Sequence, residues 1–414
     1  MDKDSTKSTF FQLFEVINNK SFLKLVRTSK TDKYTKKLTT DKLITLVALA
    51  QLDQAKGLRV ISSSLHNEEL KKSINLDSIS HSQLSRKLRD ISPDIIQSLF
   101  NEMVRRVGSA VGVNRVSEEL QRLYLIDSST ISMCLSLYNW AKFRKTKSGV
   151  KLHLRLVLCD QEVYPDKAII TPAKPADRTQ MDNLVVVEKD ALNVFDRGYL
   201  DYKKFDNYCA TGIRFVSRLK HNALVEILEE REVVPGSPIK HDRMVRLGKA
   251  GITKMKYPLR QIETEDSNGN PVVIITNDFK MSAEEIADIY RYRWQIELFF
   301  KWIKQHLYIK HLYGTSPVAV ENQILIALIS YCLLKLLQLK VGYHGSLLTI
   351  KRLLDECLYE PLSNFIQKLY RRYGPSTKGR RRINHEAIYQ ETLRQFEELE
   401  AEHLSDLTYD PVIL

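Results

Sequence analysis

Three acidic residues have types and positions that could support catalysis: Asp127, Asp196 and Glu297. Asp127 follows the apolar run LYLI and Asp196 follows NVF, both typical of β-strands, and α/β sheets present functional groups where strands end. Glu297 lies in a stretch with helical periodicity. Three carboxylates can hold two Mg²⁺ ions, because hard cations prefer oxygen ligands. Two such ions can activate an attacking oxygen and stabilise a leaving one in phosphoryl transfer.

Each acid also has an ordinary interpretation. An aspartate at the end of a strand is more often a turn former, and a glutamate on a helix is usually solvated. The residues around Glu297 favour the chemical interpretation. At about 100° per residue on a helix, four polar side chains fall in one narrow stripe: Tyr290, Arg293, Glu297 and Lys304.

Apolar residues run beside that stripe: Ile289, Ile296, Phe299, Phe300, Ile303 and Leu307. Charged side chains next to such a face lose hydration unless they have partners or a task there. A carboxylate for metal, with Arg and Lys to hold phosphates, fits this arrangement. The alternative is an i,i+4 salt bridge between Arg293 and Glu297, which is weak on a helix surface. That bridge alone leaves Tyr290 and Lys304 unexplained.

The charge balance favours a polyanionic partner. The chain carries 63 Lys and Arg residues against 50 Asp and Glu, a formal net charge of +13, which suits nucleic acid or an anionic membrane surface. The longest apolar run, residues 324–341, contains Lys335 and Lys340, so we expect a buried helix and no membrane span. The first ten residues have no apolar signal core. Five scattered cysteines disfavour structural zinc and disulfides, as in a reducing cytoplasm.

The periodicity predicts three regions. Residues 1–118 have helical patterns and 20 Lys and Arg against 13 Asp and Glu, as expected of a basic, DNA-binding domain. Residues 119–345 form an α/β region, with candidate strands at 151–159, 163–171, 213–219 and 271–276 and a mixed sheet flanked by helices. Residues 346–414 are expected to be helical, first basic and then acidic.

Two features subdivide these regions. The segment at about 221–257 alternates short apolar pieces with Gly and Pro, which indicates an inserted, mainly β element. A long helix is expected to open at Ser282, where Glu285 three residues later completes a capping-box pattern.

The N-terminal region contains a candidate DNA-reading helix. GLRVISSSL indicates one short helix, and Ser80 with Gln83 forms a capping box at the start of the next. That second helix carries Arg86, Lys87 and Arg89. Two short helices with a basic second one resemble a helix-turn-helix. The alternative is a surface helix with ordinary charges.

The motifs around the three acids resemble those of a known family. The helix pattern Tyr290-x2-Arg293-x3-Glu297-x6-Lys304 is similar to the signature helix of the bacterial insertion-sequence transposases of the IS-four family. Asp196-Arg-Gly-Tyr resembles that family's second carboxylate motif, and LIDSST around residue 127 resembles the first. The resemblance covers residues 120–345 and extends more loosely to the N-terminal helical segment.

The resemblance implies an RNase H-like core interrupted by a β-rich insertion. It implies a cut-and-paste reaction on double-stranded DNA, acting on terminal inverted repeats and target DNA, often through a hairpin intermediate. Asp127, Asp196 and Glu297 would bind Mg²⁺, with Mn²⁺ as a substitute and two ions as the expected number. The active complex would be a homodimer in the bacterial cytoplasm, associated with the nucleoid.

The same resemblance implies that Tyr290, Arg293 and Lys304 contact DNA near the cut. Trp294 occupies the position of a tryptophan that helps to hold a flipped base in a hairpin-forming relative. That relative uses a second tryptophan from its insertion, whereas residues 221–257 contain none. Two alternatives remain: a DNA-binding protein descended from a transposase that no longer cuts, and a structure-specific nuclease on the same core.

Overall fold

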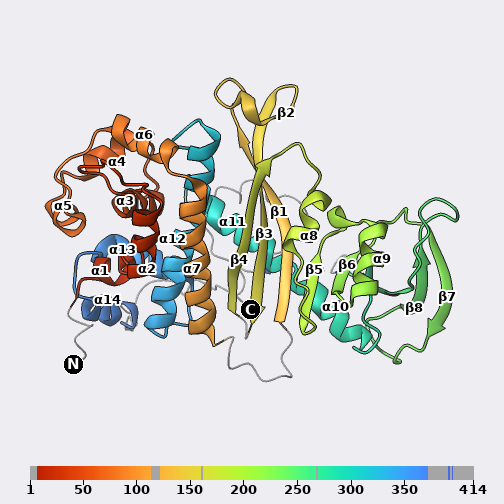
Figure 1. The fold of residues 1–414 in the computed structure, drawn as a ribbon. Coiled ribbons are helices and arrows are strands. Elements are labelled where there is room, and N and C mark those ends of the chain that lie inside the picture. The colour runs from red at the N-terminus through yellow and green to blue at the C-terminus, as the bar shows by residue number, and fades with distance from the viewer. Residues whose placement is uncertain are drawn as a thin grey trace.

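The fold places a helical body beside a large mixed sheet (Figure 1). The computed structural model describes residues 7–112, 122–159, 162–266 and 269–371, together with residues 390, 391 and 394. The basic run at 380–382 and most of the acidic C-terminal segment therefore lie outside the described residues.

Ten helices form the helical body. Seven come from the N-terminal region: α1 (Thr9–Phe14), α2 (Lys20–Thr28), α3 (Thr40–Leu52), α4 (Leu58–Ser64), α5 (Glu68–Ile74), α6 (His81–Asp90) and α7 (Pro93–Val111). Three come from the C-terminal part: α12 (Pro317–Lys340), α13 (Leu347–Cys357) and α14 (Leu362–Leu369). These two groups share one hydrophobic core.

Helix α12 is the centre of that body. It contacts α7, α3 and α6, and most of its side chains are buried, as expected of a helix that is apolar all round. By length and composition it could cross a membrane, but 78% of its apolar window is buried inside the protein. The expected buried helix at 324–341 is confirmed. Although the sequence grouped this stretch with the sheet, α12 packs against the N-terminal helices.

The sheet has the strand order β2-β3-β1-β5-β6-β10-β9-β8-β7, with β4 also paired to β3. The strands are β1 (Arg122–Met133), β2 (Lys142–Arg144), β3 (Lys147–Cys159), β4 (Glu162–Pro172), β5 (Ala191–Phe195), β6 (Arg214–Arg218), β7 (Val225–Arg231), β8 (His241–Leu247), β9 (Leu259–Glu265) and β10 (Pro271–Thr276). Strands β1, β3 and β4 are antiparallel, whereas β1, β5 and β6 run parallel. This is the RNase H-like arrangement expected from the sequence.

The remaining strands lengthen the same sheet. β10 pairs antiparallel with β6, and β9, β8 and β7 follow in antiparallel order. Segment 221–257 contains β7 and β8, so the inserted part continues the sheet instead of standing apart from it. Shorter helices, α8 (Met181–Leu184) and α9 (Tyr202–Thr211), connect the central strands.

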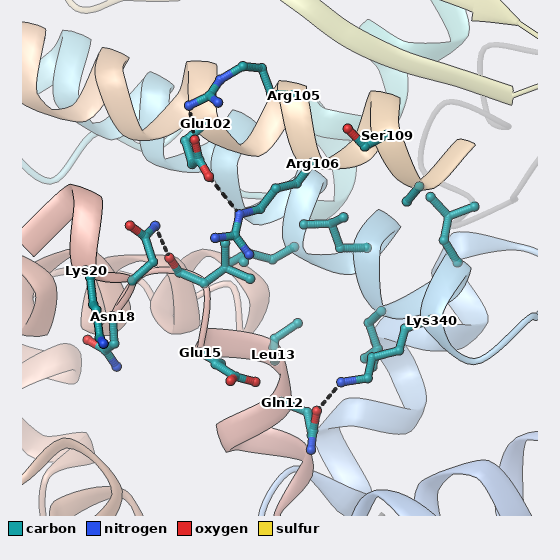
Figure 2. A pocket seen from close by; sticks show the side chains of 17 residues that line it. Gln12, Leu13, Glu15, Asn18, Lys20, Glu102, Arg105, Arg106, Ser109 and Lys340 are labelled. Atoms are coloured by element: carbon teal, nitrogen blue, oxygen red, sulfur yellow. Dashed lines mark hydrogen bonds and ion pairs between the residues drawn. The ribbon is translucent and has the colours of Figure 1, made fainter. Parts of the chain in front are cut away.

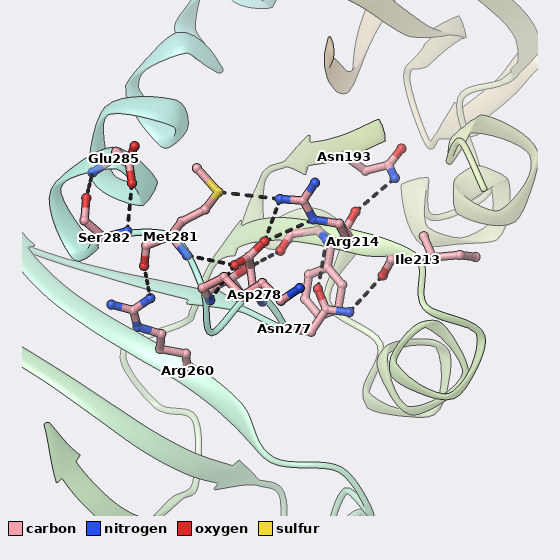
Figure 3. A network of polar contacts seen from close by, with 12 residues as sticks. Asn193, Ile213, Arg214, Arg260, Asn277, Asp278, Met281, Ser282 and Glu285 are labelled. Carbon is pink, nitrogen blue, oxygen red and sulfur yellow. Dashed lines mark hydrogen bonds and ion pairs between the residues drawn. The ribbon is translucent and has the colours of Figure 1, made fainter. Parts of the chain in front are cut away.

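A polar network fixes where the next helix begins (Figure 3). Asp278 accepts hydrogen bonds from the backbone of Lys280 and Met281 and pairs with Arg214 of β6 at 2.6 Å. Arg260 of β9 donates to the Met281 carbonyl and pairs with Asp242. Because these contacts hold residues 278–281 against the sheet, α10 (Ala283–Tyr292) starts at a defined point. The predicted capping box at Ser282 is present.

The single long helix expected from Ser282 is wrong in one respect. The structure has two helices, α10 and α11 (Trp294–His306), joined at Arg293. Two successive i−3 hydrogen bonds, Arg293 N to Tyr290 O and Ile296 N to Arg293 O, tighten the turn there. Uniform rotation per residue therefore does not hold across the junction.

Candidate active site

Asp127 and Asp196 lie on adjacent parallel strands, as expected. Ile126 is in register with Phe195, so the two aspartates that follow them lie side by side. Asp196 comes directly after β5, at the position predicted. Asp127 does not end its strand, which is a correction: β1 continues to Met133 because residues 128–133 keep pairing with β3.

Glu297 approaches these aspartates from the first turn of α11, which packs on β1. Its carboxylate pairs with Arg293 at 2.7 Å, and the same guanidinium nitrogen lies 3.8 Å from an Asp127 oxygen. Tyr290 donates a hydrogen bond of 3.4 Å to Asp196. All three acids thus contact the junction between α10 and α11.

The carboxylates do not yet form a metal cage. Among the described residues, no three His, Cys, Asp or Glu side chains are grouped so that they could hold a metal ion. The assignment of Asp127, Asp196 and Glu297 as shared metal ligands therefore stays a prediction. The Arg293 guanidinium lies between Glu297 and Asp127 and reduces the repulsion between these two acids. The oxygen donor set itself suits a hard divalent cation.

Burial dominates the electrostatics of this site. Desolvation raises the pKa of Asp127 to about 7, although the Ser128 backbone N–H and Arg293 favour its charged form. The neighbouring Asp196 and Glu297 raise the pKa further by repulsion. Arg293 is 13% exposed, and its Nε is buried without a hydrogen-bond partner. The guanidinium therefore has unused donor capacity beside the acids.

Lys304 and Trp294 occupy different surroundings. Lys304 donates 2.5 Å to the Ser129 hydroxyl and 3.3 Å to the Thr130 carbonyl, which ties α11 to β1 just beyond Asp127. Burial lowers its pKa. The Trp294 side chain, by contrast, is 49% exposed, so its ring is open to a ligand.

Sequence reasoning missed a polar cluster beside Asp127. Asp177 accepts a hydrogen bond from Ser128 at 2.6 Å and pairs with Lys151 at 3.0 Å. The His153 ring lies 3.7 Å from the same carboxylate and bonds Thr171. Ser128 and His153 are directly opposed across β1 and β3. The only signal in the sequence was a histidine inside an apolar strand, and its partner lies outside that strand.

His153 should make the fold sensitive to acid. Burial lowers its pKa to about 4 from 6.5, so the folded chain holds the neutral ring while the unfolded chain takes up a proton below pH 6.5. Stability present above pH 6.5 is thus lost as the pH falls towards 4. Between pH 7 and 5 this group should remove about 2 kcal/mol. Urea unfolding of the parent and His153→Gln at both pH values tests this; equal losses would contradict it.

The candidate DNA-reading helix differs from the expected pair. Helix α5 intervenes between α4 and α6, so the two predicted helices do not form a simple helix-turn-helix. On α6, Arg86 is exposed and Arg89 pairs with Asp90 in an exposed contact. Lys87 instead pairs with Asp32 at 2.5 Å and is 14% exposed.

The Lys87 contact is structural. Asp32 also accepts hydrogen bonds from the backbone and hydroxyl of Thr40, where α3 begins. Lys87 therefore balances a carboxylate that caps a buried helix, and in this structure its ammonium faces the protein. The predicted basic triad is reduced to two arginines that face solvent.

Comparison with known proteins gives consistent results. The model of the transposase DDE domain matches residues 118–333, just over half of the chain, and a domain of unknown function matches residues 5–72. A putative transposase from Sinorhizobium fredii is 33% identical over 242 residues, which cover 58% of this chain and 67% of the relative. A probable insertion-sequence transposase from Geobacillus stearothermophilus is 28% identical over 71% of this chain and 75% of its own length.

Two further similarities are more distant. A putative insertion-sequence transposase from a Synechocystis species is 25% identical over 74% of this chain and 87% of the relative. Among solved structures, a piggyBac transposase synaptic complex with hairpin DNA has a TM-score of 0.42 at 13% identity. That alignment covers 89% of this chain and 82% of the other.

Proposed function

This chain belongs to the family of transposases with the DDE domain and is a DNA transposase, and from this we propose that it cuts and rejoins the ends of a bacterial insertion sequence. The reaction would be cut-and-paste: phosphodiester hydrolysis at the element ends, followed by transesterification into target DNA. The carrying observation is the placement of Asp127 and Asp196 on adjacent parallel strands, with Glu297 linked to Asp127 through Arg293.

The catalytic centre is proposed to use a divalent metal, on which transposases with this domain depend. The ligands would be Asp127, Asp196 and Glu297, with Mg²⁺ as the ion, Mn²⁺ as a substitute and two ions as the expected number. When bound, the metal supplies Lewis acidity and an activated oxygen nucleophile. The chain itself positions the ligands: two strands and a helix hold the three carboxylates, and partial burial raises the pKa of Asp127.

The DNA contacts are proposed to surround those acids. Arg293 and Lys304 supply cations for phosphates near the cut, and Tyr290 lies beside them. The exposed ring of Trp294 can stack on a base. The partner is double-stranded DNA, both the terminal inverted repeats and the target, and a homodimer would bring two ends together in the bacterial cytoplasm at the nucleoid.

A strand-transfer assay tests this function. The full chain is incubated with Mg²⁺, DNA that carries the flanking sequence of its own gene, and a target plasmid. We expect excised ends joined to the plasmid. Cut ends that are never joined would favour a structure-specific nuclease. Bound but uncut ends, with Mg²⁺ and with Mn²⁺, would favour an inactive DNA-binding descendant.

The two exposed arginines of α6 should bind the element's ends, whereas Lys87 should not. Neutralising Arg86 and Arg89 together is expected to weaken end binding. The fall of log K with log salt should also become shallower, by about 2 in slope, because each phosphate contact contributes about 1. Gel shifts over a salt series measure this. Lys87→Met is the matched comparison, because it removes one cation from the same helix.

The double arginine variant and Lys87→Met should differ in which property they change. Lys87→Met leaves Asp32 without its cation, so it should lower the unfolding free energy by about 1–3 kcal/mol and leave the salt slope unchanged. End binding that is unaltered by loss of both arginines would return α6 to the interpretation as an ordinary surface helix.

A further inference from the structure

A basic hairpin projects from the sheet beyond the three acids. Strand β1 continues for six residues past Asp127 and pairs with the start of β3, while β2 pairs with β3 on its other side. Figure 1 shows β2 and the adjoining ends of β1 and β3 standing out from the rest of the sheet. Since β1 and β5 are parallel, the hairpin lies at the same edge of the sheet as Asp196.

The length of the hairpin determines how far along a DNA duplex it can reach. On β3, Leu154 is in register with Asp127, and Lys147 lies seven residues earlier, at the turn between β2 and β3. At about 3.3 Å per residue in a strand, this turn lies about 23 Å beyond Asp127. That distance corresponds to about seven base pairs of DNA. A duplex that reaches the acids can therefore also contact the hairpin.

The tip of the hairpin carries cations without acidic partners. Residues 128–159 contain six Lys and Arg and no Asp or Glu. The two cations farther from the tip have partners elsewhere in the sheet region: Lys151 pairs with Asp177, and Arg155 pairs with Asp166. The other four are exposed and form no ion pair with any residue that the structure describes: Lys142, Arg144, Lys145 and Lys147.

Contacts at its base hold the hairpin in position. Trp140, just before β2, donates a hydrogen bond of 2.8 Å to the carbonyl of Thr315, which lies just ahead of α12. A Cβ at Gly149 of β3 would lie 3.0 Å from the Phe143 ring of β2, so these two strands pack closely. The cations at the tip are therefore presented on a supported element, and a ligand needs to order little of the chain when it binds.

A groove of about 840 Å³ in the helical body is another surface lined by cations (Figure 2). Glu102 accepts hydrogen bonds from both Arg105 and Arg106 (Figure 2). Lys340, at the other side of the groove, donates to Gln12. Because these partners already engage its cations, the groove should attract a polyanion less strongly than the hairpin does.

We propose that residues 142–147 bind the phosphate backbone of the target duplex during strand transfer, an inference that rests on the proposed function. Lysine binds phosphate as a point charge, and phosphate contacts carry no information about base sequence. Residues 142–148 contain no Asn or Gln whose amide could read a base edge. Such a surface suits target DNA, because its sequence changes from one insertion to the next whereas the element's ends stay the same.

Strand transfer from ends that are already cut isolates the target step. The full chain is incubated with Mg²⁺, pre-cut element ends and a target plasmid. The variant combines Lys142→Gln, Lys145→Gln and Lys147→Gln. We expect transfer to fall about tenfold, because three phosphate contacts are lost. Excision of uncut ends by the same variant should match the parent's, which also shows that the variant is folded.

The opposite edge of the sheet provides a matched control. Lys189 precedes β5, Lys249 follows β8 and Lys256 precedes β9, and all three side chains are exposed. The strand register places these positions at the edge away from the acids. Replacing all three with Gln removes the same charge and should leave transfer unchanged. Replacing the three hairpin lysines with Arg, which keeps the charge, should preserve transfer as well.

Salt dependence tests the hairpin even if the parent neither cuts nor joins DNA, a result that would count against the proposed function instead. In gel shifts with a duplex of random sequence, the fall of log K with log salt should become shallower by about 3 in the hairpin glutamine variant. The control variant should keep the parent's slope. Equal effects of the hairpin and control variants would overturn the proposal. So would a loss of excision as large as the loss of transfer, which would place the hairpin on the DNA that is cut.

Discussion

Replacing Asp127, Asp196 or Glu297 with its amide is expected to lower the rate of DNA strand cleavage by about 10³-fold or more. The amides keep the shape of each side chain but remove a charged ligand, and metal ions supply several kcal/mol of transition-state stabilisation, at about 1.4 kcal/mol per tenfold in rate. End binding should persist, because the acids add repulsion and no attraction for phosphates. Cleavage and gel-shift assays on the same three variants measure both effects.

Asp177 provides the matched control for that series. It is a carboxylate beside the site, bound to Ser128 and Lys151, and it is not among the proposed ligands. Asp177→Asn should therefore reduce cleavage far less than the three amides do. Parental cleavage by any of the three amide variants would contradict the metal assignment. An equal loss of cleavage in Asp177→Asn would place Asp177 among the catalytic acids.

The parts of the fold that depend on local pattern could be predicted from the sequence. The strand at 271–276 has the predicted bounds, and the capping boxes at Ser80 and Ser282 are present because both partners lie within one turn. The end of β1 was missed for the opposite reason. The sequence places Asp127 where its apolar run ends, but pairing with β3, 15 to 25 residues away, keeps the partly polar residues 128–133 in the strand.

Contacts between distant residues also limit what the sequence predicts about the site. Spacing alone selected Tyr290, Arg293 and Glu297 as neighbours, and they do share the α10–α11 junction. No neighbouring residue in the sequence indicates that Lys87 pairs with Asp32, 55 residues earlier. The same holds for the position of Arg293 between Glu297 and Asp127. Such pairings depend on which charges the folded sheet brings within reach, so a motif identifies the participants better than it identifies their contacts.

Arg293 should compete with metal for the carboxylates when no DNA is present. Its guanidinium contacts Glu297 at 2.7 Å and lies 3.8 Å from Asp127, so an ion that takes both oxygens must displace it. A charge-assisted hydrogen bond is worth about 1.5–3 kcal/mol. Arg293→Gln is therefore expected to bind Mn²⁺ at least about tenfold more tightly than the parent in calorimetric titrations without DNA.

A phosphate near the cut would draw the same guanidinium away, so DNA binding should tighten metal binding in the parent and much less in Arg293→Gln. Arg291→Gln is the control, since Arg291 lies two residues away on α10 and, among the residues that the structure describes, pairs only with the exposed Asp288; its Mn²⁺ affinity should match the parent's. Arg293→Lys, which keeps the charge but loses the fork of donors, should fall between. Unchanged or weaker Mn²⁺ binding in Arg293→Gln would mean that Arg293 supports the acids without blocking them, and that metal enters this site independently of DNA.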